Sequence, residues 1–223
     1  MMTAAAWAQQ YQPPAGEPPV GPRGSNGTRD GCGETYGIPL TALAPTQHVG
    51  RTTSTTPTFV WFIPATSPYR INLAFYSVNE DQQRELLHQV ESIESASGIV
   101  NFTLPADEFD LSPGQHYQWQ VSIACVADSP RYDQSFVSTL EIVEPPTAIA
   151  AALTVAQTPL EKAEIYAEAG YWYDALREAM IASDNSDPDG IATSLLHELA
   201  KSEGGLHGYY LIQISEILND TGF

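Results

Sequence analysis

Short apolar segments separated by turn residues fill the chain from Ile38 to about Pro145. Thr58–Ile63 is rich in β-branched and aromatic residues, and Ile71–Val78 alternates in part between apolar and polar positions. Both patterns are typical of strands, and clusters of Gly, Pro, Asn, Asp and Ser lie between them. About seven strands at this spacing predict an antiparallel β-sandwich. The strand segments with the clearest pattern are 58–63, 71–78, 84–90, 98–104, 116–126 and 136–143.

After Pro145 and Pro146 the apolar positions follow a helical period. Thr158 is a good N-cap, Pro159 suits the first helical position, and Glu161 completes a capping box. Gly170 separates this helix from the next one. The expected helices are 159–169, 172–183, 191–203 and 208–219, and residues 147–158 are expected to be partly helical.

Two segments resemble known folds. Leu111–Val121 is similar to the L-x-P-G-x-x-Y-x-W-x-V stretch of fibronectin type III and related immunoglobulin-like domains, where Tyr117 would bond back to the turn. Residues 166–176 resemble one tetratricopeptide hairpin, and the absence of a second such unit argues against a solenoid. The predicted class is α+β, with an immunoglobulin-like antiparallel sandwich over 38–145 and a small α-helical region over 146–223.

Residues 1–37 form a predicted arm. Five prolines and then five glycines favour extended or coil structure over packing. Ala6-Trp7-Ala8 looks like a signal-peptidase site, although a charged start and an apolar core segment do not precede it. Residues 1–8 are therefore interpreted as the remnant of a longer signal peptide, with a short polar start on a cytoplasmic protein as the alternative.

Composition narrows the class of partner. Apolar residues make up 43% of the 223 residues and charged residues only 16%, which indicates a folded chain rather than an acidic disordered one. The 27 acidic side chains outnumber the 9 basic ones, for a net charge of −18. That charge opposes binding to nucleic acid and to anionic lipid. No apolar run is long enough to span a membrane.

Two cysteines lie in contrasting surroundings: Cys32 in the Gly-rich arm and Cys125 in an apolar run. A disulfide between them would tether the arm and stabilise the fold by about 4–5 kcal/mol in the chain-entropy model. The alternative is two unrelated thiols, with Cys125 acting as a small buried hydrophobe. The disulfide is favoured, and it implies an oxidising compartment.

The order of these parts resembles a known family. The arm with Gly27-Thr28-Arg29 and Cys32 precedes 57–64, the Tyr117-Gln118-Trp119 stretch and the helical segment 161–176. Together they are similar to the mainly cyanobacterial family called domain of unknown function nine-two-eight, over residues 20–217. The resemblance implies export and no established activity, so it supplies no catalytic residue. Family arms often hold paired arginines, whereas this arm has single Arg23 and Arg29.

Two weak metal patterns occur in the helical region. Residues 197–207 match the H-E-x-x-H-x-x-G-x-x-H zinc pattern except that Lys201 replaces the second histidine, and lysine cannot ligate zinc at neutral pH. Residues 185–190 resemble half of a calcium loop with Asn185, Asp187 and Asp189 as candidate ligands, but position 12 is Leu196. A turn with Asp189 as the N-cap of the next helix is the preferred interpretation, and neither a metal nor a cofactor is predicted.

Consecutive aromatics supply the remaining candidates. Tyr171, Trp172 and Tyr173 cannot all face one core from a helix, so with Tyr209 and Tyr210 they either line the sandwich–helix junction or form a contact surface. No Gly-x-Ser-x-Gly elbow or cysteine–histidine pair suggests catalysis. The sequence therefore predicts a non-catalytic, exported adaptor that binds a protein or itself. The alternatives are a filament or sheath subunit assembled through the arm and, third, a hydrolase.

Overall fold

The structure is a computed structural model that describes residues 11–14, 18–21, 37–63, 69–93, 98–106, 109, 111–124, 133–184 and 190–221. Strands precede helices along the chain, which confirms the predicted α+β class. Within the described residues the strands are β1 (Thr41–Ala42), β2 (Gly50–Thr52), β3 (Thr58–Ile63), β4 (Arg70–Val78), β5 (Arg84–Ile93), β6 (Gly98–Thr103), β7 (His116–Ala124) and β8 (Gln134–Ile142). The helices are α1 (Thr147–Val155), α2 (Pro159–Glu168), α3 (Trp172–Asp184), α4 (Ile191–Glu203) and α5 (Gly205–Thr221).

The strands form two sheets, with orders β1-β3-β6 and β2-β8-β7-β4-β5. Their inner faces meet in an aromatic core that contains Phe59, Phe75 and Trp119. The sheets are antiparallel, as predicted, except that the short edge strand β2 runs parallel to β8. The two- and three-residue strands β1 and β2 escaped sequence analysis because they are too short to show a period.

The corner predicted at Tyr117 is present. The backbone N–H of Ser112 donates to the Tyr117 hydroxyl at 3.0 Å, which ties the start of β7 to the preceding turn. The β7 residues Tyr117, Trp119 and Val121 point inward as the alternation of the sequence predicts, and all three are buried.

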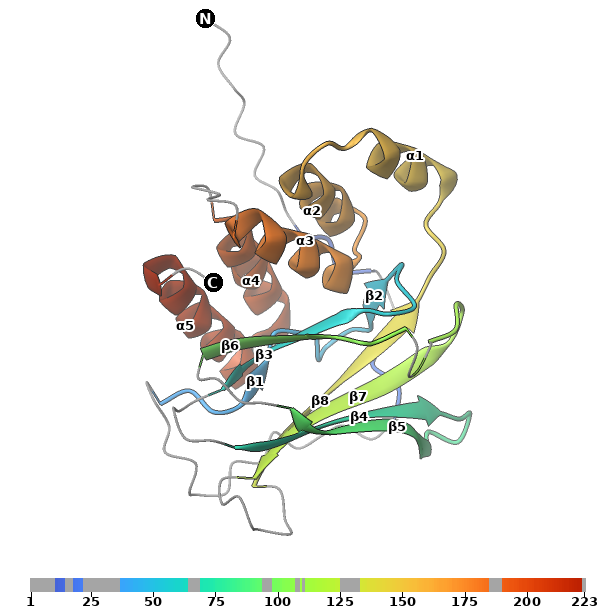
Figure 1. Cartoon of the computed structure of the whole chain (residues 1–223), viewed down its shortest axis with the longest axis vertical. Helices are drawn as coiled ribbons and strands as arrows, with labels where there is room; N and C mark the ends of the chain where they lie inside the picture. Colours follow the sequence, from blue (N-terminus) through green and yellow to red (C-terminus); the bar gives the residue numbers. More distant parts are fainter. Residues whose placement is uncertain are drawn as a thin grey trace, which may run out of the picture.

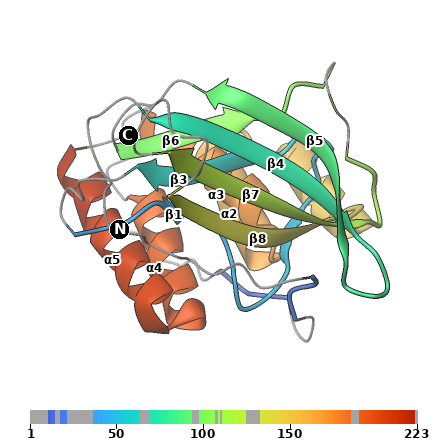
Figure 2. The same ribbon diagram turned by 90° about the horizontal axis from the view of Figure 1, so that it is seen from below.

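The helices gather beside β1, β2 and β3, whereas β4 and β5 lie on the far side of the sandwich (Figure 1). The view from below shows α4 and α5 side by side at one end of the strands (Figure 2). The sequence signals at α2 hold, since Thr158 and Glu161 form the capping box. Gly170 has a φ of +80°, which favours glycine at the break before α3.

Sandwich and helices share one core. A single set of contacting buried residues runs from Phe59 and Trp119 in the strands to Trp172 and Leu199 in the helices. The predicted boundary near residue 145 therefore separates two kinds of secondary structure, while the packing is continuous across it.

The arm behaves differently from the prediction wherever it is described. Tyr11 is only 2% exposed, and the backbone N–H of Gln12 donates to the carbonyl of Ala167 at 3.2 Å. Further along, the Val20 carbonyl accepts hydrogen bonds from the side chains of Gln118 and Thr139. The chain at 11–14 and 18–21 therefore packs against the sandwich and the helices. Tyr11 anchors it through its buried ring, and the many prolines and glycines of the arm gave no sign of this packing in the sequence.

Candidate functional site

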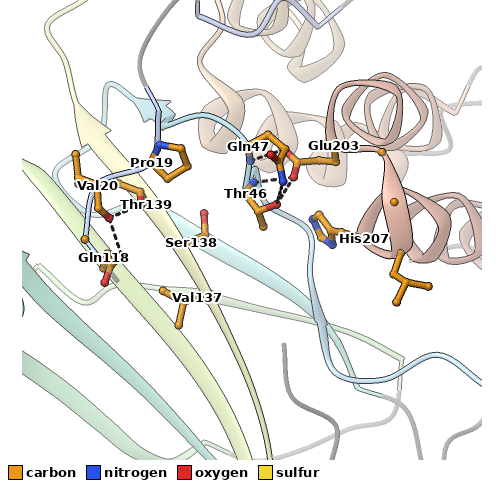
Figure 3. A pocket seen from close by; sticks show the side chains of 14 residues that line it. Pro19, Val20, Thr46, Gln47, Gln118, Val137, Ser138, Thr139, Glu203 and His207 are labelled. Carbon is orange, nitrogen blue, oxygen red and sulfur yellow. Dashed lines mark hydrogen bonds between the residues drawn. The ribbon is translucent and has the colours of Figure 1, made fainter. Parts of the chain in front are cut away.

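A pocket of about 280 Å³ lies where five parts of the chain meet (Figure 3). Residues 19–21 of the arm form one wall, and residues 203–207, the turn between α4 and α5, form the opposite wall. Residues 46–47, between β1 and β2, residues 137–139 of β8 and Gln118 of β7 complete it. The pocket therefore lies at the junction of arm, sandwich and helices.

Glu203, the last residue of α4, is the acidic group of this site. Its side chain is fully buried, and its carboxylate accepts hydrogen bonds from the Thr46 N–H at 2.9 Å, the Thr46 hydroxyl and the Gln47 N–H at 3.2 Å. A carboxylate at a helix C-terminus is disfavoured by the helix dipole, so these three donors offset an unfavourable position. Glu203 fastens the end of α4 to the loop before β2.

A chain of polar contacts extends from Glu203 to the arm. His48 Nδ1 lies 3.7 Å from Glu203 Oε1, and His48 Nε2 lies 2.8 Å from the Tyr11 hydroxyl. Burial lowers the pKa of His48, and the charge of Glu203 opposes that shift. Burial also raises the pKa of the Tyr11 hydroxyl well above its ordinary value. At neutral pH a neutral His48 accepts a hydrogen bond from the Tyr11 hydroxyl at Nε2, so the arm is held by a buried neutral hydrogen bond.

His207 of α5 lies on the same wall of the pocket as Glu203 (Figure 3). Its Nε2 is 3.0 Å from the carbonyl of Ala44, so Nε2 carries the ring proton and donates it. Its Nδ1 is buried and has no hydrogen-bond partner among the described residues. Burial lowers the pKa of His207, and the ring packs 5.0 Å from that of Phe136. His207 thus joins α5 to the sandwich as a neutral side chain.

Ser138 also lines the pocket. Its hydroxyl donates to the Pro45 carbonyl at 2.6 Å and lies 3.3 Å from the Tyr173 hydroxyl. Neither partner is a general base, so Ser138 is not arranged as an activated nucleophile. The pocket offers polar and strand-edge groups for binding.

The three aromatics expected at a junction or a contact surface lie at the junction. Tyr171, Trp172 and Tyr173 are all buried, so their candidacy as a binding surface was wrong. The indole N–H of Trp172 donates to the Leu43 carbonyl at 2.8 Å, and that of Trp119 donates to the Tyr173 hydroxyl at 2.8 Å. All three rings can be buried because α3 begins at Trp172. Tyr171 lies just before the helix, so the helical spacing does not fix the direction of its ring.

The neighbouring contacts show how tightly this junction is filled. A Cβ on Gly50 would lie 2.7 Å from the Tyr173 ring, so only glycine fits there. Burial raises the pKa of Tyr173 to about 12. Burial likewise raises the pKa of Asp174 to about 6, although the carboxylate accepts a hydrogen bond from the Thr53 N–H at 2.7 Å.

The other two aromatic candidates lie on α5 and reach the surface. Tyr209 is 56% exposed and Tyr210 is half-buried, with their ring centroids 5.7 Å apart. Leu206 and Ile212, at 72% and 40% exposure, lie three residues before and after Tyr209. We call Leu206, Tyr209 and Ile212 the α5 stripe, because this spacing places them along one side of the helix. Leu206 and Ile212 were not predicted to be exposed, because aliphatic residues at this helical spacing resemble ordinary core positions.

The metal patterns fare differently. His197 is exposed on α4, Lys201 pairs with Glu198, and His207 faces the sandwich from α5, so the zinc pattern does not come together. Across the described residues no group of three or more His, Cys, Asp or Glu is arranged to hold a metal ion. Asn185, Asp187 and Asp189 lie outside the described residues, as do Cys32 and Cys125. The N-cap of α4 is Gly190 rather than Asp189.

Among the described helices, none combines the length and the apolar character that crossing a membrane requires.

Comparison with known proteins gives one decisive match. Residues 24–207 match the model of the family described as Domain of Unknown Function (DUF928). The chain belongs to this family. No curated protein sequence matches the DUF928 chain.

Two solved structures show distant likeness. A lytic polysaccharide monooxygenase of Cellvibrio japonicus, important for efficient utilization of chitin, is 13% identical with a TM-score of 0.28, over 54% of this chain and 75% of its own. Astrotactin-2, a vertebrate-specific, perforin-like membrane protein involved in neuronal development, is 14% identical with a TM-score of 0.32, over 82% of this chain and 38% of its own. At such scores neither structure bears on the function of the DUF928 chain.

Proposed function

We propose that this DUF928 chain is a non-catalytic, exported binding module of the cell envelope that holds a partner protein on the α5 stripe. The observation that carries the proposal is the exposure of Leu206, Tyr209 and Ile212 on one side of α5, next to the pocket. Exposed apolar side chains that gather with an aromatic are typical of protein contact sites. Leu206 belongs to both features, so stripe and pocket are continuous.

The polar groups of the pocket support binding rather than catalysis. The carboxylate of Glu203 is occupied by backbone donors, and the Ser138 hydroxyl is turned to a carbonyl. A nucleophile next to a general base, the minimum for a hydrolase, is not formed by these residues. The scaffold we propose is an immunoglobulin-like sandwich, supported by the Tyr117 corner, with a tetratricopeptide-like hairpin in α2 and α3.

Export and a Cys32–Cys125 disulfide form part of the proposal. The N–H of Leu40, eight positions after Cys32, donates to the Gln134 side chain at 2.7 Å. Gln134 pairs across the sheet with Ile123, two positions before Cys125. The described chain that follows Cys32 and the described chain that precedes Cys125 therefore lie close together at one end of β7. Peptide mapping without reductant tests the bond, and two alkylated thiols in protein from its native compartment would exclude it.

The partner is tested with immobilised full-length protein and an envelope extract. We expect the wild-type chain to retain a protein that a Leu206→Ser/Tyr209→Ser variant retains about tenfold less, because two anchors are lost. The matched control is Leu86→Ser/Leu87→Ser, which changes two comparably exposed side chains on β5. Equal retention by the wild type and the α5 variant, with both chains folded, would refute the proposed surface.

A further inference from the structure

The pocket borders a stretch of β8 that lacks a strand partner on one side. β2 pairs with β8 only from Gly50↔Leu140 to Thr52↔Ile142. The pocket touches Val137, Ser138 and Thr139, which are consecutive. Because successive strand side chains point to opposite faces, a pocket lined by three in a row reaches the edge of the strand. It also extends over one face of the sheet, since Gln118 of β7, which pairs with Thr139, lines it too.

Backbone direction along β8 follows from two hydrogen bonds. The Ile142 N–H donates to the Gln115 carbonyl on the β7 side, whereas the Val143 N–H donates to the Thr52 carbonyl on the β2 side. Backbone groups alternate along an antiparallel strand, so Ser138 and Leu140 face β7. Val137 and Thr139 face away from it, toward the pocket.

Three backbone groups remain at this edge beyond the end of the β2 ladder. They are the N–H of Thr139 and both the N–H and the C=O of Val137, and no described residue forms a backbone hydrogen bond with them. An open strand edge of this kind is a template for another extended chain.

The arm lies next to this edge without completing it. Pro18 and Pro19 have no N–H to donate. The carbonyl of Val20 is taken by the side chains of Gln118 and Thr139, and the N–H of Gly21 donates to Gln82. The arm therefore forms a wall of the pocket and covers Thr139, which is buried, whereas Val137 is only half-buried and its edge groups stay accessible.

We propose that the pocket binds an extended peptide segment of a partner protein, which pairs as an added strand with the N–H and C=O of Val137. The acidic side chain of the described lining is Glu203, and the whole chain carries a net charge of −18, so the segment is uncharged or basic. The inference rests on the proposed function, because the same partner would cover Leu206 at the rim. It names the partner's conformation and charge.

The probe is the capped pentapeptide Lys-Val-Lys-Val-Lys, added to isotope-labelled full-length protein and followed by backbone amide NMR. We expect the largest shift at the amide of Val137. The matched control is the same peptide with its inner amides N-methylated, which removes backbone donors and keeps charge and side chains. It should bind about tenfold more weakly, as for the loss of one hydrogen bond. Equal binding of both peptides, or no shift at β8, overturns the proposal.

Hydrogen exchange of the free chain tests the edge without any ligand. The amide of Val137 should exchange fast, and those of Ser138 and Leu140 slowly. Slow exchange at all three shows that the edge is already paired and overturns the proposal. A Val137→Pro variant should lose peptide binding while its β7 ladder remains intact, because the missing N–H faces the pocket. If this variant does not fold, the comparison of the pentapeptide with its N-methylated control and the exchange pattern of the free chain still test the proposal.

Failure of this inference is distinguishable from failure of the proposed function. Loss of envelope-protein retention in the α5 variant, together with unchanged β8 amides, leaves the α5 surface standing and removes the peptide groove. Self-association of the chain in light scattering, with the same β8 amides shifted, assigns the groove to a second copy and overturns the partner peptide.

Discussion

Two junctions attach the helices to the sandwich, and both contact the loop segments that flank β1 and β2. At the α3 junction, Trp172 and Tyr173 fill the space against Leu43 and Gly50, and Asp174 caps Thr53. At the α4–α5 junction, Glu203 and His207 hold Thr46 and Ala44, but a pocket remains beside them. The first junction is closed by aromatic packing, and the second is closed by hydrogen bonds around an open space.

The two junctions differ in whether their polar groups already have partners within the protein. In the α3 junction the polar atoms of Trp172 and Tyr173 have partners inside the protein. In the α4–α5 junction, His207 Nδ1 and the edge of β8 do not have such partners among the described residues. Unused polar groups beside a cavity are what a ligand can satisfy, so binding is expected at the second junction and stability at the first.

Removing the indole of Trp172 tests the first half of this comparison and should have the largest effect. Trp172→Ala deletes a fully buried side chain and leaves the Leu43 carbonyl unpaired. We expect a loss of about 3–5 kcal/mol in the free energy of unfolding, measured with urea. Tyr209→Ala on the exposed stripe is the control and should change it by less than about 0.5 kcal/mol. Similar losses in both variants would contradict the idea that the α3 junction stabilises the fold while the exposed α5 stripe does not.

The α3 junction was largely foreseeable, since its parts are local and periodic. The capping box at Thr158, the break at Gly170 and the aromatic run that follows all carry short-range signals, and the structure places them as expected. What the pattern could not decide was whether Tyr171–Tyr173 faced inward or outward. That depends on Gly50, which lies more than a hundred positions earlier and makes room for the Tyr173 ring.

The α4–α5 junction could not be foreseen, because its residues are brought together only by the fold. Glu203 and Thr46 are 157 positions apart, and Tyr11 and His48 are 37 apart. His207 was noticed only as part of a zinc pattern, and Glu203 only as an unspecified position within it. The short strand β2 has no period of its own, so neither its parallel pairing nor the open edge that it leaves on β8 can be read from the sequence.

Removal of the Glu203 carboxylate should have the second largest effect. Glu203→Ala leaves the N–H groups of Thr46 and Gln47 without their acceptor, and we expect a loss of about 2–3 kcal/mol. Glu198→Ala is the matched control on the same helix, because its pair with Lys201 is exposed and worth under about 1 kcal/mol. Urea unfolding measures both. A loss at Glu203 no larger than that at Glu198 would mean that the hydrogen bonds do not hold this junction.

The pH dependence of stability should differ in sign between the junctions. Burial raises the pKa of Asp174 to about 6, so the folded state holds its proton longer than the unfolded state and loses stability as pH rises from about 4 to 6. Burial lowers the pKa of His48 and His207, so there stability falls as pH drops below about 6.5. The opposing slopes partly cancel in the wild type.

The variant Asp174→Asn separates the two opposing pH dependences. It should remove the acidic contribution and leave stability that rises with pH from 4 to 7. The complementary variant is His48→Gln/His207→Gln, whose stability should instead decrease over the same range. Melting temperatures across this pH series provide the measurement, and parallel curves for the two variants would show that burial does not shift these groups in opposite directions.

The smallest effect should come from the hydrogen bond that joins the arm to the second junction. Tyr11→Phe keeps the ring that packs 4.9 Å from Trp172 and removes only the donor to His48 Nε2. We expect a loss of about 1 kcal/mol, the net worth of one neutral hydrogen bond, whereas Tyr209→Phe, with an exposed ring, should change nothing. Faster amide exchange at Gln12 would accompany that loss, because its N–H is bonded to Ala167 only while the arm is docked. If exchange at Gln12 is unchanged although stability falls, Tyr11 stabilises the buried cluster without holding the arm, and the arm is then anchored at Val20 instead.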